Sequence, residues 1–149
     1  MARVRVTKQF DFEMAHALWN YDGPCKNLHG HSYRLFVTVT GQPAHEKTNP
    51  KNGMVIDFGD LKKIVNETVI HRFDHATVIS RDVPESYYSD MGEMLEKLHI
   101  LDYQPTCENM IVDFASRIKK RLPPEVQLHS LRLQETATSW AEWIAADNI

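Results

Sequence analysis

The chain has 149 residues, 42% of them apolar and 25% charged, a composition typical of one soluble globular domain with one hydrophobic core. Its net charge of −3 and pI near 6.2 do not favour nucleic-acid binding, and no stretch approaches the roughly 20 apolar residues of a membrane span. With two cysteines it cannot form a disulfide framework, so we expect a single cytoplasmic domain over residues 1–149.

Two strands are predicted in the first forty residues. Apolar and polar side chains alternate over residues 4–16, which is the pattern of a half-buried strand ending at His16. A loop rich in turn-forming residues follows and contains Cys25. In the next strand the odd-numbered positions share one face, so His29 and His31 point the same way.

The middle of the chain is predicted to contain a connection, a short strand and a helix. The connection covers residues 41–53, and residues 54–56 form the short strand. Asp57 is a candidate N-cap for a helix whose apolar residues recur at three and four positions over residues 58–69. The helix is predicted to have ended where residues 72–79 begin.

The last third is predicted to contain helices followed by two strands. Helical spacing of apolar residues suggests a short extra helix in residues 89–99, and Thr106 is the N-cap of a second main helix, residues 106–122. Strands follow at residues 126–135 and 138–144. The order predicts an α+β fold with a four-stranded antiparallel sheet, two main helices on one face, and edges that an oligomer would bury.

Three histidines form the candidate metal site. His29 and His31 project from one face of a strand, and His16 ends the neighbouring strand on its apolar face. Three imidazole ligands with a fourth position left to water or substrate are a recurring catalytic zinc arrangement. Ordinary strand histidines remain the alternative, because the His-x-His pattern alone is common.

Cys25 and the pair Asp74-His75 are candidate proton-transfer groups. Cys25 lies four residues before His29, close enough for its sulfur to reach a metal or a ligand bound there. A nearby positive charge would make its thiolate a usable base. Two alternatives to this role remain. As a fourth zinc ligand, Cys25 would close the site and make it structural; otherwise Cys25 is an inert buried thiol. In a loop, Asp74 could orient His75 for proton transfer.

Two carboxylates are candidate ligand-binding groups. Glu108 lies at the start of the second main helix, where its charge also suits the helix dipole. Glu135 ends a strand. Either carboxylate could accept paired N–H donors from a guanidine-like heterocycle edge, because it presents two oxygens in one plane.

Six motifs follow one another through nearly the whole chain. They are Glu13-Met14-Ala15-His16, Cys25-x-x-x-His29-Gly30-His31-Ser32-Tyr33, Gly53-Met54-Val55-Ile56-Asp57-Phe58, Asp74-His75, Pro105-Thr106-x-Glu108-Asn109 and Glu135-Thr136. As an ordered set they resemble the 6-pyruvoyltetrahydropterin synthase family.

The resemblance implies a role for each candidate residue. It implies zinc bound by His16, His29 and His31, Cys25 as the general base, Asp74 with His75 as a proton-relay pair supplied by a neighbouring subunit, and Glu135 as the pterin anchor with Thr106 and Glu108 beside it. It also implies the tunnelling fold, in which trimers close their sheets into a barrel and two trimers stack into a homohexamer.

The short gap between Cys25 and His29 resembles the bacterial 6-carboxytetrahydropterin synthases more than the animal pyruvoyl-forming branch. The expected reaction converts 7,8-dihydroneopterin triphosphate to 6-carboxytetrahydropterin with loss of triphosphate and acetaldehyde, an early step toward queuosine. One alternative is a 6-pyruvoyltetrahydropterin synthase, which eliminates triphosphate without cleaving the side chain. Another is a non-catalytic zinc module. A barrel hydrolase is excluded, because that fold typically needs about 250 residues.

Overall fold

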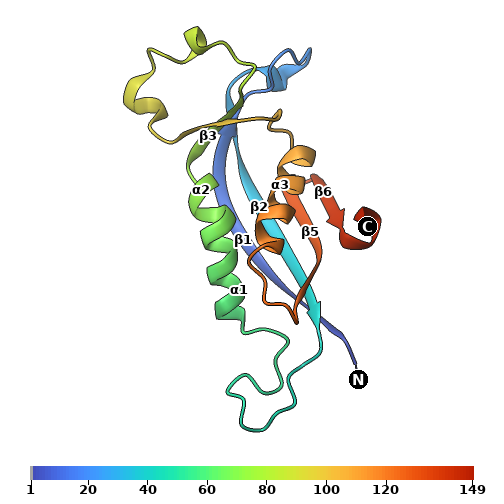
Figure 1. Ribbon diagram of the computed structural model, residues 1–149. Helices are drawn as coiled ribbons and strands as arrows, with labels where there is room; N and C mark the ends of the chain where they lie inside the picture. Colours follow the sequence, from blue (N-terminus) through green and yellow to red (C-terminus); the bar gives the residue numbers. More distant parts are fainter. Residues whose placement is uncertain (1) are drawn as a thin grey trace.

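The computed structural model describes residues 2–149 as a curled six-stranded sheet with two helices packed on one face (Figure 1). The strand order is β4-β3-β1-β2-β5-β6. β1 (Val4–His16), β2 (His29–Gly41), β5 (Gln127–Thr136) and β6 (Ser139–Ile144) pair in antiparallel fashion, whereas β3 (Ala76–Ser80) runs parallel to β1 and β4 (Leu98–Leu101) parallel to β3.

The long central hairpin of β1 and β2 confirms the predicted alternation. On β1, Phe10, Phe12 and Met14 are buried while the residues between them are exposed. The pairing places His16 opposite His29 at the end of the hairpin where the connecting loop joins the two strands. A period-two pattern therefore brings the histidines of both strands to the same face and the same end of the sheet.

Both predicted main helices are present. Asp57 caps α1 (Phe58–Val65) by accepting a hydrogen bond from the backbone N–H of Gly59 at 2.6 Å. This helix continues through a π-helical turn, η2 (Asn66–Ile70), into α2 (His71–Phe73). Thr106 caps α3 (Cys107–Lys119) through the N–H of Asn109 at 3.2 Å. Within residues 2–149 no helix has the length and apolarity to span a membrane.

Aromatic side chains join the sheet to both helices. Phe12 of β1 stacks on Tyr33 of β2 with ring centroids 5.0 Å apart. Phe114 of α3 meets Phe12 edge-on at 6.1 Å and Phe73 of α2 at 5.0 Å. All four are almost fully buried, so the sheet, α2 and α3 share one core directly beneath the histidine end of the hairpin.

The predicted four-stranded antiparallel sheet is wrong in strand number and direction. β3 lies in the segment expected only to leave the helix, and β4 lies at the end of the predicted extra helix. β3 pairs with only the last three residues of β1, and β4 is four residues long. Strands this short carry too little alternation to be recognised from sequence, and β3 is almost entirely buried, which removes the alternation altogether.

Two further local predictions are also wrong. In place of a helix in residues 89–99 there is one 3-10 turn, η4 (Gly92–Leu95), because Gly92 adopts a left-handed φ of 57° that interrupts a helix. Residues 54–56 form no strand: Val55 and Ile56 are bends, and the N–H of Ala44 donates to the carbonyl of Met54 at 3.0 Å. The remaining turns are η1 (Pro24–Lys26), η3 (Glu85–Tyr87) and η5 (Ala145–Asn148).

Candidate metal centre and active site

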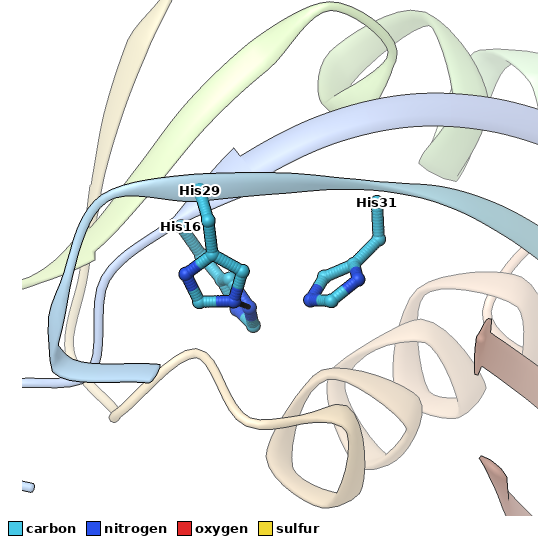
Figure 2. A group of neighbouring side chains, drawn as sticks. All are labelled: His16, His29 and His31. Atoms are coloured by element: carbon cyan, nitrogen blue, oxygen red, sulfur yellow. Dashed lines mark hydrogen bonds between the residues drawn. The ribbon is translucent and has the colours of Figure 1, made fainter. Parts of the chain in front are cut away.

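The three predicted metal ligands converge. His16 comes from the end of β1, and His29 and His31 come from the start of β2, with their rings directed toward the segment that leads into α3 (Figure 2). One potential ligand atom from each ring lies within 4.8 Å of the others. His16 is almost fully buried, and the other two rings are partly exposed, which leaves one side of the cluster open.

Backbone carbonyls fix the rings of two of these histidines. Nδ1 of His16 donates to the carbonyl oxygen of Pro105 at 2.7 Å, and Nδ1 of His29 donates to that of Asn27 at 2.6 Å. Because a carbonyl oxygen only accepts, each ring in its neutral form carries its lone pair on Nε2. Hydrogen bonds of this kind commonly orient metal-binding histidines.

The lone pairs of these two rings face each other. The Nε2 atoms of His16 and His29 are 3.1 Å apart, and two lone pairs repel at that distance unless a proton or a cation lies between them. Tetrahedral zinc, with Zn–N bonds of 2.0–2.1 Å, separates neighbouring ligand nitrogens by about 3.3 Å. The arrangement therefore fits a metal ion bound by imidazole nitrogens.

The third ring is also available to a metal. Nε2 of His31 is buried without a hydrogen bond of good geometry, although it lies 3.3 Å from Oε1 of Glu135. Burial lowers the pKa of His31, an effect that Glu135 opposes and His29 assists. A lower pKa favours the neutral ring, which is the form that binds metals.

Burial also keeps His16 neutral. It lowers the pKa of His16 to about 4; the hydrogen bond to Pro105 acts in the opposite direction, and the neighbouring His29 and His31 lower the pKa further. His16 is therefore unprotonated at neutral pH and can act as a ligand.

Cys25 lies outside this ligand group. It sits in η1, is partly exposed, and forms no disulfide. In residues 2–149 the group able to hold a metal contains His16, His29 and His31, with no sulfur among its close ligand atoms. The structure thus places Cys25 in the loop between the strands that carry the histidines, without closing the site.

Glu135 and Tyr33 form the floor beside the histidines. Leu35 of β2 pairs with Leu133 of the antiparallel strand β5, so Tyr33, two residues before Leu35, and Glu135, two residues after Leu133, occupy the same face. Tyr33 is fully buried, and its hydroxyl has no hydrogen-bond partner among the described residues. Burial, Glu135 and then Cys107 raise the pKa of Tyr33, which remains a neutral phenol. Tyr33 shares the odd-numbered face of His29 and His31, but its residue type alone does not distinguish it from a core residue in the sequence.

Asp74 and His75 lie on the opposite face of the sheet. Asp74 Oδ1 accepts a hydrogen bond from the N–H of Glu13 at 2.9 Å and lies 3.0 Å from His75 Nδ1. Burial alone would raise the pKa of Asp74, but the bonds from Glu13 and His75 hold it below its ordinary value. His75, with a left-handed φ of 61°, is exposed beside Glu13 and Ser32. His75 and His31 border the same surface hollow, but within the described residues neither Asp74 nor His75 belongs to the histidine ligand group.

The segment before α3 is tied to the histidine cluster. Gln104 accepts from the N–H of Trp19 at 3.0 Å and donates to its carbonyl at 2.7 Å. Pro105 binds His16, and Thr106 then begins α3. Glu108, in the first turn, is exposed. Of the predicted substrate-binding residues, Glu135 therefore contacts the histidine cluster directly, and Thr106 and Glu108 lie on the segment anchored beside it.

The fold and the site agree with the family comparison. The sheet is mixed, and three imidazoles lie beside a carboxylate. The family model described as 6-pyruvoyl tetrahydropterin synthase matches residues 5–145, and the chain belongs to this family of enzymes that act on pterins.

Its relatives include both branches of the family. A 6-carboxy-5,6,7,8-tetrahydropterin synthase from Haemophilus influenzae is 38% identical, covering 93% of this chain and 97% of its own. One from Aquifex aeolicus is 31% identical, with 93% and 96% covered. A 6-pyruvoyl tetrahydrobiopterin synthase from Pongo abelii is 30% identical, with 90% and 86% covered.

Solved structures show the same fold at lower identity. An uncharacterized protein from Wolinella succinogenes superposes with a TM-score of 0.75 at 21% identity, covering 97% of this chain and 99% of its own. The 6-pyruvoyl tetrahydropterin synthase from Caenorhabditis elegans gives 0.67 at 22% identity, with 97% and 96% covered. At these identities the structures support the fold alone.

Proposed function

We propose that the chain is a zinc-dependent 6-carboxytetrahydropterin synthase that converts 7,8-dihydroneopterin triphosphate to 6-carboxytetrahydropterin, releasing triphosphate and acetaldehyde. The observation that carries the proposal is the meeting of His16 Nε2 and His29 Nε2 at 3.1 Å, with His31 beside them and Glu135 3.3 Å from His31. A metal site and a carboxylate anchor are thus adjacent, as a pterin with a polar side chain requires.

Each residue has a definite task in this reaction. Zinc, when bound to the three histidines, supplies positive charge that polarises the side-chain hydroxyls of the substrate and acidifies the adjacent C–H. Glu135 accepts the paired N–H donors of the pterin edge. The Cys25 thiolate removes the substrate proton, and His75, oriented by Asp74 of the same chain, relays a proton in a neighbouring subunit's site.

The proposed assembly is a cytoplasmic homohexamer, a dimer of trimers. Its support is the position of the proton-relay pair, which lies across the sheet from the histidines of its own subunit. The sheet also ends in two edge strands, β4 and β6, whose unpaired backbone groups are suited to pairing with another subunit. Light scattering of the purified protein gives the subunit number directly.

A product assay tests the reaction. The zinc-loaded protein is incubated with 7,8-dihydroneopterin triphosphate, and acetaldehyde and triphosphate are measured together. We expect equal amounts of both, because only the carboxy-forming route cleaves the side chain. Triphosphate without acetaldehyde would establish the second candidate, a 6-pyruvoyltetrahydropterin synthase, which the relative from Pongo abelii supports. Release of neither product contradicts both.

A variant of Cys25 separates catalysis from a structural zinc module. If Cys25 is the base, Cys25→Ala abolishes turnover and leaves zinc content unchanged. If the sulfur instead completes a closed four-ligand site, the same variant loses zinc and stability. The absence of Cys25 from the histidine ligand group favours the first outcome.

A further inference from the structure

The peptide that joins Asp74 to His75 is held at both of its polar ends. Its carbonyl oxygen accepts a hydrogen bond from Nζ of Lys97 at 2.5 Å. Its N–H donates to the carbonyl oxygen of Glu13, a residue of β1, at 2.6 Å. Because the C=O and N–H groups of a trans peptide are coplanar and point in opposite directions, the two bonds fix this peptide from opposite sides.

The backbone of His75 requires such support. His75 has a φ of 61°, in the left-handed region that residues other than glycine adopt only at an energetic cost. A residue in this conformation persists where its surroundings determine it. Since φ relates the direction of the side chain to the preceding peptide, the two bonds also determine where the imidazole of His75 is presented.

Lys97 is itself anchored beside this turn. Its own carbonyl oxygen accepts from the N–H of Thr77 at 3.0 Å, directly before β4 begins. Its Nζ donates a second hydrogen bond, to the carbonyl oxygen of His71 in α2 at 2.8 Å. An ammonium group has three donors, so one side chain can bind both carbonyls. Lys97 therefore connects the last turn of the helix with the residue that follows it.

Helix capping accounts for only part of this arrangement. Lysine side chains often satisfy carbonyl groups at the C-terminus of a helix, and the bond to His71 is of that kind. The neighbouring His99 makes an equivalent bond, in which Nε2 donates to the carbonyl oxygen of Arg72 at 2.7 Å. Asp74, however, is the C-cap and has extended backbone. The bond from Lys97 to Asp74 thus acts on the turn that carries His75, beyond the helix.

We propose that Lys97 is a positioning residue for the proton-relay pair, because it fixes the peptide between Asp74 and His75 and thereby the direction of the His75 imidazole. This inference rests on the proposed function, in which His75 relays a proton. Lys97 acts through the relay pair and not on the metal or the substrate. Its loss therefore lowers the turnover rate while metal binding and substrate affinity remain.

Three variants separate positioning from helix capping. Lys97→Met removes the ammonium group and keeps an unbranched side chain, and Lys97→Arg keeps donors that can bind two acceptors. His99→Phe, the matched control, removes a bond to α2 without affecting the carbonyl of Asp74.

Each variant is compared with the zinc-loaded wild type in two measurements. The first gives kcat and KM with 7,8-dihydroneopterin triphosphate. The second is hydrogen exchange, by mass spectrometry, of the peptides that cover residues 74–76, which is independent of the reaction. Zinc content and thermal unfolding establish that each variant is folded and loaded.

The variants are expected to differ in rate. Lys97→Met keeps its zinc and a KM within about twofold of the wild type, while kcat falls about 10- to 100-fold, because a small displacement of a proton-transfer group lowers rate more than affinity. Exchange at residues 74–76 becomes about tenfold faster in the same variant. Lys97→Arg recovers most of kcat and the slow exchange, and His99→Phe retains the wild-type values of both.

Other results overturn the inference. An equal loss of kcat in Lys97→Met and His99→Phe would assign the effect to the end of α2 as a whole. Wild-type kcat in Lys97→Met despite faster exchange would show that the position of His75 does not limit the reaction. If the wild type releases no product, the proposed function fails, but the exchange comparison still tests the contact, and slow exchange in Lys97→Met contradicts it.

Discussion

His16 and His29 face each other through their Nε2 atoms at 3.1 Å, and each ring is held from behind by a hydrogen bond from Nδ1 to a backbone carbonyl oxygen. Two adjacent strands in fixed register therefore hold the lone pairs in place. A metal ion can enter without rearrangement of the sheet, so the cost of organising the site is met during folding.

Removal of one imidazole should abolish metal retention. We expect His29→Ala to lose most of its zinc on dialysis against a weak chelator, because two histidines do not form a stable zinc site. His129→Ala, at a position outside the ligand group, is the control and should retain about one zinc per chain. Full zinc content in His29→Ala, measured by elemental analysis, would show that the metal binds elsewhere.

The metal-free protein should lose stability as the pH falls from 6.5 to about 4. The pKa of His16 is lowered from 6.5 to about 4 in the folded state, so over this range the unfolded chain takes up a proton that the folded chain does not. The unfolding free energy should fall by up to about 3 kcal/mol from this residue. Denaturant titrations at several pH values measure it.

A variant isolates the contribution of His16 to this pH dependence. Metal-free His16→Gln should show a shallower decrease than the metal-free wild type, since the titrating ring is absent. Equal slopes for the two proteins would mean that other groups cause the loss.

The two cysteines should differ in reactivity. Burial, followed by the nearby charge of Glu135, raises the pKa of Cys107 to about 12, and its thiol donates to the carbonyl of Leu133 at 3.2 Å. Cys25 is partly exposed. At pH 8 the folded metal-free protein should react rapidly with a thiol reagent at Cys25, and at Cys107 only after denaturant is added. Rapid modification of the Cys25→Ala variant would contradict this assignment.

Thr106 should contribute to stability as a helix cap. Thr106→Ala removes the oxygen that accepts from Asn109 at 3.2 Å, and we expect a loss of about 1 kcal/mol in unfolding free energy. Thr106→Ser retains the capping oxygen and should remain within a few tenths of a kcal/mol of the wild type. If both variants are equally destabilised, the methyl group matters and the cap does not.

The position of Asp74 and His75 predicts complementation between subunits. Cys25→Ala and His75→Ala should each be inactive alone. If the relay acts in a neighbouring subunit's site, random co-assembly at equal amounts makes about a quarter of the sites intact. Activity assays of co-refolded mixtures should therefore show recovery to about that fraction. Mixtures as inactive as their components would place both groups in one subunit's site.

The sequence predicted the features that arise from local pattern. The alternation in β1 and β2 fixed which residues share a face, and so placed His16 beside His29 and His31. The caps Asp57 and Thr106 were also recognised, because each precedes an amphipathic run with a side-chain acceptor in the correct position.

Features set by tertiary contacts were not recognised. β3 pairs in parallel with β1 because the helical segment from α1 to α2 ends beside that strand. The sequence of a five-residue strand does not encode this position. That the hydroxyl of Tyr33 lacks a partner is likewise a property of its three-dimensional surroundings. From sequence alone it is one apolar-face residue among several.

The bonds between Gln104 and Trp19 determine which part of the chain can change length. Together with the pairing of β4 with β3, they fix the end of the excursion that runs over residues 81–96, before Pro105 meets His16. Insertions or deletions within residues 81–96 are absorbed before the chain reaches the histidines, since lengthening a loop whose ends are held costs little free energy. Evolution can thus remodel this excursion freely, while a single shift between residues 104 and 106 would move the carbonyl that orients His16.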